Sequence, residues 1–133
     1  MKKLILALAF APTLLVGVAQ AQTVSDDVHK QLWCGTALVV AYSTIPADAD
    51  QAMLDDQKAY TEAGTALIDT ATKAHLDAGF TQEAVDKLKA DLIAAITPIV
   101  TEGGDASKAE YTFGDCDALV HPPAPADASS SAM

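Results

Sequence analysis

Positively charged residues are scarce in this chain of 133 residues, which has eight lysines, no arginine and eighteen aspartates and glutamates. The formal net charge of -10 at pH 7 argues against nucleic acid or an anionic lipid surface as a partner, because both require a basic face. Arginine is also the usual residue for holding a phosphate or carboxylate group through two hydrogen bonds. Its absence argues against catalysis on phosphorylated or acidic substrates.

The sequence motifs of the common catalytic sites are missing as well. The chain has no Gly-x-Ser-x-Gly, no glycine-rich phosphate loop and no His-Glu-x-x-His. It has no Cys-x-x-Cys, which argues against a thioredoxin-like redox site, and no Cys-x-x-Cys-His for covalent haem attachment. We therefore predict that the protein is not an enzyme and carries no cofactor.

The first twenty-one residues contain the three parts of a secretory signal peptide. A cationic start at Lys2 and Lys3 precedes an apolar run over 4–18, and residues 19–21, Ala-Gln-Ala, supply the pattern that a signal peptidase recognises. The apolar run is short for a spanning helix and is interrupted by Pro12, which argues against an uncleaved anchor. We predict that the signal peptide, residues 1–21, is cleaved, and that the protein is exported to the periplasm, with secretion from the cell as an alternative. No membrane association is expected after cleavage.

Hydrophobic residues make up 50% of the chain, a fraction typical of a folded protein, and the length predicts one domain. After cleavage, eighteen acidic residues and six lysines would remain, a formal charge of -12. Many of the hydrophobic residues are alanine, and only 5% of the whole chain is aromatic. Such a composition favours closely packed helices over a β-sandwich. We predict an all-α fold over residues 22–120, a small bundle of three main helices with a short C-terminal element.

The two cysteines, Cys34 and Cys116, predict a structural disulfide, because an even number of cysteines in an exported chain is usually paired. The bridge would close a long loop, which in the chain-entropy model stabilises the fold by about 4 kcal/mol. A small core rich in alanine would depend on this contribution. Zinc binding by the cysteines is the weaker alternative, since no histidine lies nearby at ligand spacing.

Local signals place the helices. Capping residues predict helices over 25–43, from about 50 to 78, and from 81 to about 97, where Pro98 kinks or ends the third helix. Gly79 is a stop signal after the second helix, which at ~45 Å is the longest and is expected to form the spine of the bundle.

The C-terminal part of the chain is expected to be less regular. A short helix is predicted over 105–111, followed by a turn over 113–116 that delivers Cys116 to the first helix. Residues 121–133 are rich in proline, alanine and serine and predict a disordered tail.

Few side chains are candidates for a functional site. The three histidines, His29, His75 and His121, do not pair at helical spacing, so no metal site is expected, although folding could still bring them together. Trp33 precedes Cys34 and is expected to pack over the disulfide. A seam of alanine and glycine leaves room for a pocket between the helices, and we name Trp33, Tyr60 and His75 as its ligand-binding candidates.

Two functions remain open from the sequence. The first is a small exported, non-enzymatic periplasmic protein, either a chaperone-like stress-protection module or a module that binds another protein. With Trp33-Cys34, Cys116 and its predicted export, the chain resembles in outline the small periplasmic acid-stress chaperones, which are helical and have one disulfide; the resemblance assigns no site residues. It implies a response to acid, because carboxylates lose their charge below about pH 4. The alternative is a periplasmic carrier of a small apolar ligand or a metal.

Overall fold

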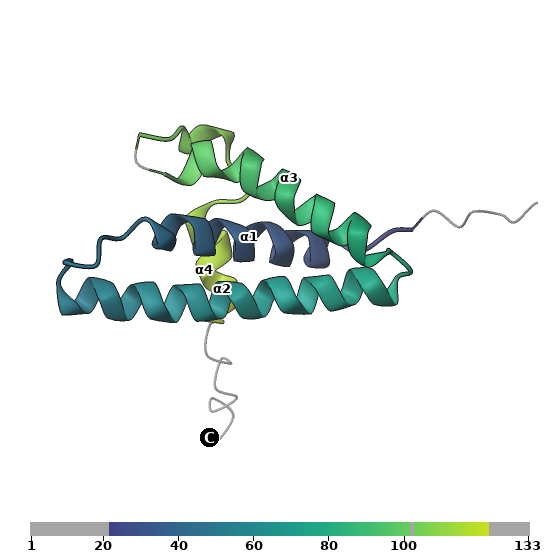
Figure 1. The fold of residues 1–133 in the computed structure, drawn as a ribbon, viewed down its shortest axis with the longest axis horizontal. Helices are drawn as coiled ribbons and strands as arrows, with labels where there is room; N and C mark the ends of the chain where they lie inside the picture. Colours follow the sequence, from purple (N-terminus) through teal and green to yellow (C-terminus); the bar gives the residue numbers. More distant parts are fainter. Residues whose placement is uncertain (1–21, 102, 123–133) are drawn as a thin grey trace, which may run out of the picture.

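The computed structural model describes residues 22–101 and 103–122, and these residues form an all-α structure without strands (Figure 1). Its helical elements are α1 Asp26–Ser43, α2 Gln51–Asp77, α3 Gln82–Val100, the short 3₁₀ helix η1 Ala106–Lys108, and α4 Phe113–Val120. The prediction of three main helices with a short C-terminal element is confirmed. The predicted signal peptide and residues 123–133 of the predicted tail lie outside the described residues.

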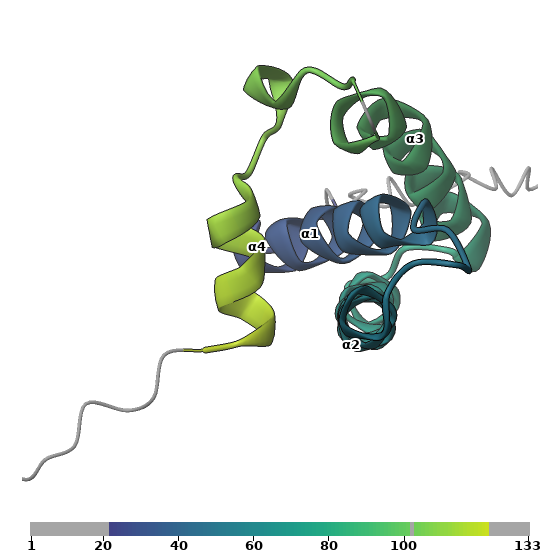
Figure 2. The same ribbon diagram turned by 90° about the vertical axis from the view of Figure 1, so that its left-hand side faces the viewer.

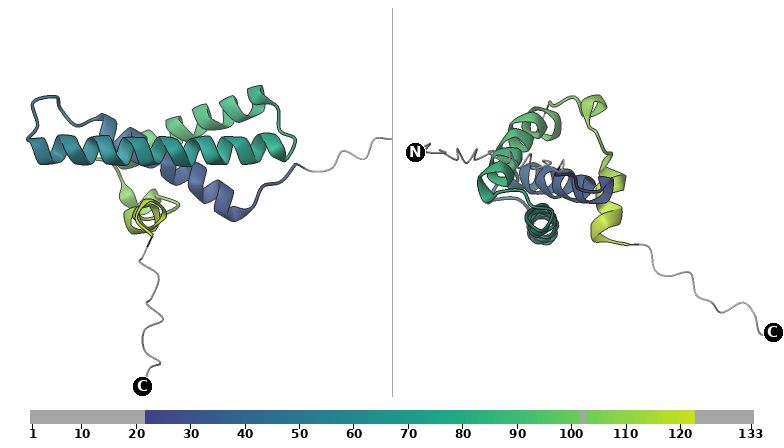
Figure 3. Two further views of the ribbon diagram at one scale, coloured as in Figure 1. Left: turned by 90° about the horizontal axis from the view of Figure 1, so that it is seen from below. Right: turned by 90° about the vertical axis from the view of Figure 1, so that its right-hand side faces the viewer.

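The helix α1 occupies the centre of the arrangement. It contacts α2, α3 and α4, which surround it on three sides in the views along its axis (Figures 2 and 3). The helix α4 runs across α1 and α2 rather than along them (Figure 1). The second helix is the longest, as predicted, but the central position expected of it belongs to α1, because seven consecutive residues of α1, 32–38, are buried.

Capping residues begin the helices where the sequence predicts. The side chains of Ser25, Asp50 and Thr81 each accept a hydrogen bond from the backbone N–H three residues later. Gly79, with φ at 92°, follows α2 in the left-handed conformation that ends many helices. These local signals therefore determine the starts of the three main helices and the end of α2.

The third helix continues past the proline that was expected to kink or end it. Pro98 lies in the last turn of α3, and the helix extends to Val100. The Thr101 N–H donates to the Thr97 carbonyl at 3.2 Å, so helical hydrogen bonding is present three residues after the proline. Because a proline removes one backbone donor, its effect here is confined to that last turn.

The helices α1 and α2 approach each other closely at two glycines. A Cβ atom added at Gly35 would lie 2.6 Å from the Gly64 carbonyl oxygen, and one added at Gly64 would lie 2.9 Å from the Gly35 carbonyl oxygen. Both distances are below any ordinary carbon–oxygen contact, so only glycine fits at either position. The role of Gly35 is therefore the close packing of α1 against α2.

The start of α4 differs from the sequence prediction. Residues 113–116 form the first turn of a helix instead of a connecting turn, and the helix expected over 105–111 is reduced to η1. Thr112 and Asp115 cap this helix reciprocally: Thr112 Oγ1 accepts from the Asp115 N–H at 3.2 Å, and Asp115 Oδ2 accepts from the Thr112 N–H at 2.9 Å. Glycine and aspartate in this stretch are typical of turns, but the reciprocal caps make them a helix start.

One disulfide fastens α4 to the central helix. Cys34 and Cys116 are joined by an S–S bond of 2.04 Å across a sequence separation of 82 residues, as predicted. Both cysteines belong to the main buried cluster, together with Trp33, Leu38 and Ile96. No helix in the described part of the chain combines the length and apolar character needed to cross a bilayer.

Candidate functional site

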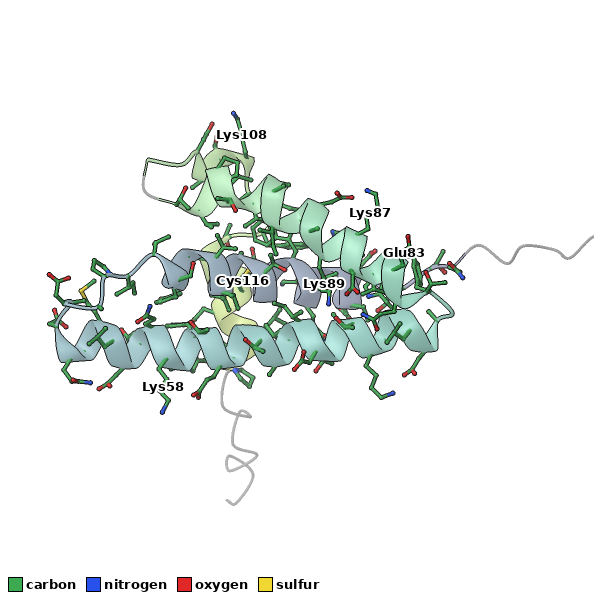
Figure 4. All side chains as sticks on the ribbon, viewed as in Figure 1. Lys58, Glu83, Lys87, Lys89, Lys108 and Cys116 are labelled. Atoms are coloured by element: carbon green, nitrogen blue, oxygen red, sulfur yellow. A yellow bond between two sulfur atoms is a disulfide. The ribbon has the colours of Figure 1, made fainter. Side chains whose placement is uncertain are left out.

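A pocket with a volume of about 390 Å³ lies beside the disulfide. It is bounded by α1, α3, α4 and residues 103–112, which join α3 to α4, include η1, and are called the strap below. Cys116 lines the pocket and lies in the middle of the molecule, where α4 passes α1 (Figure 4). The Cys34–Cys116 bond therefore holds two walls of the pocket together.

The central helix forms one wall of this pocket through Trp33, Ala37, Leu38 and Ala41. Trp33, Ala37 and Ala41 follow one another at intervals of four residues and therefore share one face of the helix. The two alanines leave space next to the large indole ring, which is only 5% exposed. Because small residues stand here in place of large ones, a hollow remains in front of Trp33.

The opposite wall comes from segments that are distant in sequence. Ile99 and Val100 belong to the last turn of α3, Ala106 and Ala109 to the strap, and Phe113 to the first turn of α4. Figure 2 shows the strap running from the end of α3 to the start of α4. Phe113 is 58% exposed, so it stands where the pocket meets the surface.

Three contacts fasten the strap to α1. The rings of Tyr111 and Trp33 meet edge to face, with centroids 5.5 Å apart. Lys30 Nζ lies 5.6 Å from the centre of the Tyr111 ring, within the range of a cation–π contact. His29 Nε2 lies 2.9 Å from Glu110 Oε1. These contacts hold the strap against the wall that Trp33 forms.

The start of α4 is held in place by a carboxylate. Hydrogen bonds from the side chain and backbone of Thr112, and then the nearby Lys30, keep the pKa of Asp115 below its usual value. Lys30 Nζ lies 3.8 Å from Asp115 Oδ1, so this lysine connects α1 to both the strap and α4. The ionised form of Asp115 therefore stabilises the end of the strap next to the pocket.

The lining of the pocket is almost entirely apolar. None of its residues is an aspartate, glutamate, lysine or histidine. Within 22–101 and 103–122, no group of three or more histidine, cysteine, aspartate or glutamate side chains is placed to hold a metal ion. The polar side chains of the lining are Tyr111 and Thr112, and the remaining walls suit an uncharged apolar molecule.

The structure does not bring the three predicted ligand-binding residues together. Trp33 lines the pocket, whereas Tyr60 and His75 are not among its lining residues. His75 is buried near the end of α2, where its Nδ1–H donates to the Ala71 carbonyl at 2.7 Å and its ring meets Phe80 edge to face. Ligand binding at Tyr60 or His75 stays a prediction.

Tyr60 belongs to a second aromatic cluster, where α4 crosses α2. Its ring stacks on Tyr42 with centroids 4.5 Å apart, and its hydroxyl donates to Asp117 Oδ1 at 2.7 Å. This hydrogen bond, followed by burial, raises the pKa of Tyr60 to about 12, while the hydrogen bonds from Tyr60 and then His121 lower that of Asp117. Phe113 lies 5.9 Å from the Tyr60 ring and therefore belongs both to this cluster and to the pocket.

The sequence analysis did not predict the strap or the two aromatic residues Tyr111, within it, and Phe113, directly after it. A usable signal was present, because the run Tyr111-Thr112-Phe113 stands just before Cys116. A disulfide to Cys34 must carry these rings to the part of the first helix that contains Trp33. The predicted bridge therefore already implied an aromatic site next to Trp33.

No family model, curated protein or solved structure matches this chain. Its function is therefore argued from the pocket and the contacts around it.

Proposed function

We propose that this protein is an exported carrier of a small, uncharged apolar molecule, which it binds between α1, α3, the strap and α4. The observation that carries this proposal is the pocket of about 390 Å³, with Trp33, Tyr111 and Phe113 in its walls. Small-molecule sites usually have volumes of about 300–1,000 Å³ and mostly apolar and aromatic walls. Size and lining both place this pocket in that class.

The covalent frame supports binding by a preformed site. Cys116 is both a lining residue and one end of the disulfide, so the walls from α1 and α4 stay together without a ligand. A site that is already assembled loses less conformational entropy when it binds. A rigid apolar pocket suits a molecule that is poorly soluble in water and has to be carried through it.

The chemistry of the lining supports binding rather than catalysis. Proton transfer at neutral pH is usually carried out by a carboxyl, imidazole or amine group, and no lining residue supplies one; the phenol of Tyr111, whose pKa is raised above its ordinary value, is a poor base there. Export to the periplasm belongs to the same proposal: it rests on the signal-like residues 1–21, and the disulfide is compatible with an oxidising compartment.

The proposal is tested by filling the pocket. Ala109→Leu adds three carbons to a partly buried strap residue that lines the pocket, and Ala90→Leu makes the same change at an exposed position of α3 outside it. We expect the fluorescent probe phenylnaphthylamine to bind the unaltered protein and Ala90→Leu with equal affinity. Its affinity for Ala109→Leu should be at least tenfold lower, which corresponds to a loss of about 1.4 kcal/mol.

A thermal melt of both variants serves as the folding control. If the probe binds none of the proteins saturably, or binds Ala109→Leu as tightly as Ala90→Leu, the carrier proposal is wrong.

A second candidate function is acid-induced protection of other proteins. It is favoured by the way α4 is attached: Asp115 and Asp117 hold the helix through hydrogen bonds that are stronger when the carboxylates are ionised. Strong acid removes these charges and would loosen α4 while the disulfide keeps it tethered, uncovering the apolar walls. If far-UV circular dichroism and dye binding stay flat from about pH 7 to 2, with no suppression of client aggregation, this candidate is excluded.

A further inference from the structure

The indole nitrogen of Trp33 lacks a partner in a place where one is normally present. Only 5% of the Trp33 surface is exposed, yet its N–H makes no hydrogen bond to another described residue. Buried tryptophans usually donate this hydrogen to a hydrogen-bond partner. Trp33 is also part of the pocket wall.

The indole nitrogen is not sealed inside the protein. Among the described residues, only Thr72 Oγ1 is both completely enclosed and without a hydrogen-bond partner. The Trp33 nitrogen therefore still reaches open space, and the pocket is the space that this side chain lines.

The other polar side chains of the pocket are already engaged. Thr112 Oγ1 donates to Asp115 Oδ2 at 2.6 Å and accepts from the Asp115 N–H, and Cys116 is in the disulfide. Burial, then the carboxylates of Glu110 and Asp26, and a side-chain hydrogen bond to Glu110 raise the pKa of Tyr111, so Glu110 engages its hydroxyl. The Trp33 N–H is the donor left for a bound molecule.

The volume of the pocket sets the size of that molecule. A cavity of about 150 Å³ holds one benzene ring. The pocket is about two and a half times as large, at about 390 Å³, which is room for two or three fused rings.

The lining also sets the charge of the molecule. No charged side chain lines the pocket to pair with an ionised group, and the nearby carboxylates, Glu110 in the strap and Asp115 in α4, already face His29 and Lys30. An ion would therefore enter the pocket without a partner.

We propose that the carried molecule is uncharged, has two or three fused rings, and presents a carbonyl or ether oxygen that accepts a hydrogen bond from Trp33 Nε1–H. This inference rests on the proposed carrier function and specifies its ligand class. The rings fill the space before Ala37 and Ala41, and the oxygen supplies the partner that the indole lacks.

Three probes of one shape test the inference on the unaltered protein: acetylnaphthalene, ethylnaphthalene and naphthoate. They share the ring system and differ by a carbonyl, a methylene or a charged carboxylate. The chain contains a single tryptophan, so an isotope-labelled sample has one indole N–H signal in a proton–nitrogen correlation spectrum. We expect the ketone to bind about three- to tenfold more tightly than the hydrocarbon and to move this signal downfield. Naphthoate should bind most weakly.

The variant Trp33→Phe keeps an aromatic ring and removes the donor. Ketone and hydrocarbon should then bind with equal affinity, measured by calorimetry, with a thermal melt as the control for folding. If this variant does not fold, the comparison of probes on the unaltered protein decides alone.

The outcomes separate the two proposals. Equal binding of ketone and hydrocarbon to the unaltered protein, with no movement of the indole signal by the ketone, overturns the inference and leaves the carrier function standing. Naphthoate binding as tightly as the ketone also overturns it. Failure of all three probes to bind overturns the carrier function itself.

Discussion

Tyr111 meets Trp33 edge to face with ring centroids 5.5 Å apart, and this contact joins the strap to the central helix. Tyr111 is brought there by the disulfide five residues further along the chain, which anchors Cys116 to Cys34. One covalent bond and one aromatic pair thus close the pocket between them.

The variant Tyr111→Ala should remove the contact between the strap and Trp33 and leave the pocket more open. Removing the ring loses the pair with Trp33, worth about 0.5–1.5 kcal/mol beyond the area it buries, and removes part of the pocket wall. We expect a lower melting temperature and about tenfold weaker binding of phenylnaphthylamine. Tyr111→Phe keeps the ring and should resemble the unaltered protein in both measurements. Equal loss in the two variants would show that the hydroxyl, and not the ring pair, is responsible.

Removal of the disulfide should destabilise the whole fold. Replacing Cys34 and Cys116 together by alanine opens a loop of 82 residues, and the chain-entropy model gives a loss of about 4 kcal/mol. For a domain of this size, the melting temperature should fall by about 15 °C or more. Thermal unfolding followed by circular dichroism measures the change. An unchanged melt would show that the bridge contributes nothing to stability.

Acid should weaken the attachment of α4. The folded-state pKa of Asp115 is lowered by Thr112, so its contribution to stability is present above the ordinary value of about 3.9 and is lost as pH falls through the lower folded value. Asp115→Asn should therefore reduce stability at neutral pH and flatten its dependence on pH below about 4. Asp69→Asn is the control, because that exposed side chain makes no hydrogen bond to another described residue. Parallel pH profiles for the two variants would contradict this role of Asp115.

Tyr60 should lose its proton at unusually high pH. Its pKa is raised to about 12, chiefly by the hydrogen bond to Asp117, so the neutral phenol stabilises the fold below its ordinary pKa of about 10, and this contribution is lost as pH rises through about 12. Ultraviolet absorbance against pH should show a tyrosine titrating near pH 12 in the unaltered protein. The variant Tyr60→Phe should lack that step. The region above about pH 11, midway between the ordinary and the raised pKa, is the one to compare. If the absorbance curves of Tyr60→Phe and the unaltered protein coincide there, the high pKa belongs to another residue.

The crossing of α1 and α2 should not tolerate a side chain at its centre. In Gly64→Ala the new Cβ would lie 2.9 Å from the Gly35 carbonyl oxygen, and backbone atoms cannot move aside without shifting a helix. We expect a loss of about 1–3 kcal/mol in the free energy of unfolding, measured with urea. Gly114→Ala is the matched control in α4, since its Cβ would meet Thr112 Oγ1 at an ordinary 3.8 Å. Similar losses in both variants would indicate that helix flexibility, and not the crossing, determines the effect.

Features set by neighbouring residues could be read from the sequence. Ser25, Asp50 and Thr81 cap helices through side chains that reach only three residues along the chain, and Gly79 ends α2 through its own φ. The disulfide was predictable because two cysteines leave one pairing. The caps of α4 were equally local, but the glycine and aspartate after Phe113 matched a turn as well as a helix start.

The pocket depends on contacts that no local pattern contains. Tyr60 and His75 were predicted to share one site because they lie in adjacent rows of the same helix. In the structure, α4 packs on Tyr60 through Phe113, and Phe80 packs against His75. Which side chains contact Tyr60 and His75 depends on where other segments, α4 above all, pack against α2. Only the disulfide gave long-range information, and it is the link between the predicted Trp33 and the unpredicted Tyr111.

Native mass spectrometry of the protein purified from its own host tests the carrier function most directly. A carrier should retain a small molecule as an added mass that solvent denaturation releases, both in the unaltered protein and in Ala90→Leu. The pocket-filling variant Ala109→Leu, prepared in the same way, should show only the mass of the chain. A bare chain in all three preparations, or an added mass that Ala109→Leu retains in full, would contradict ligand binding in this pocket.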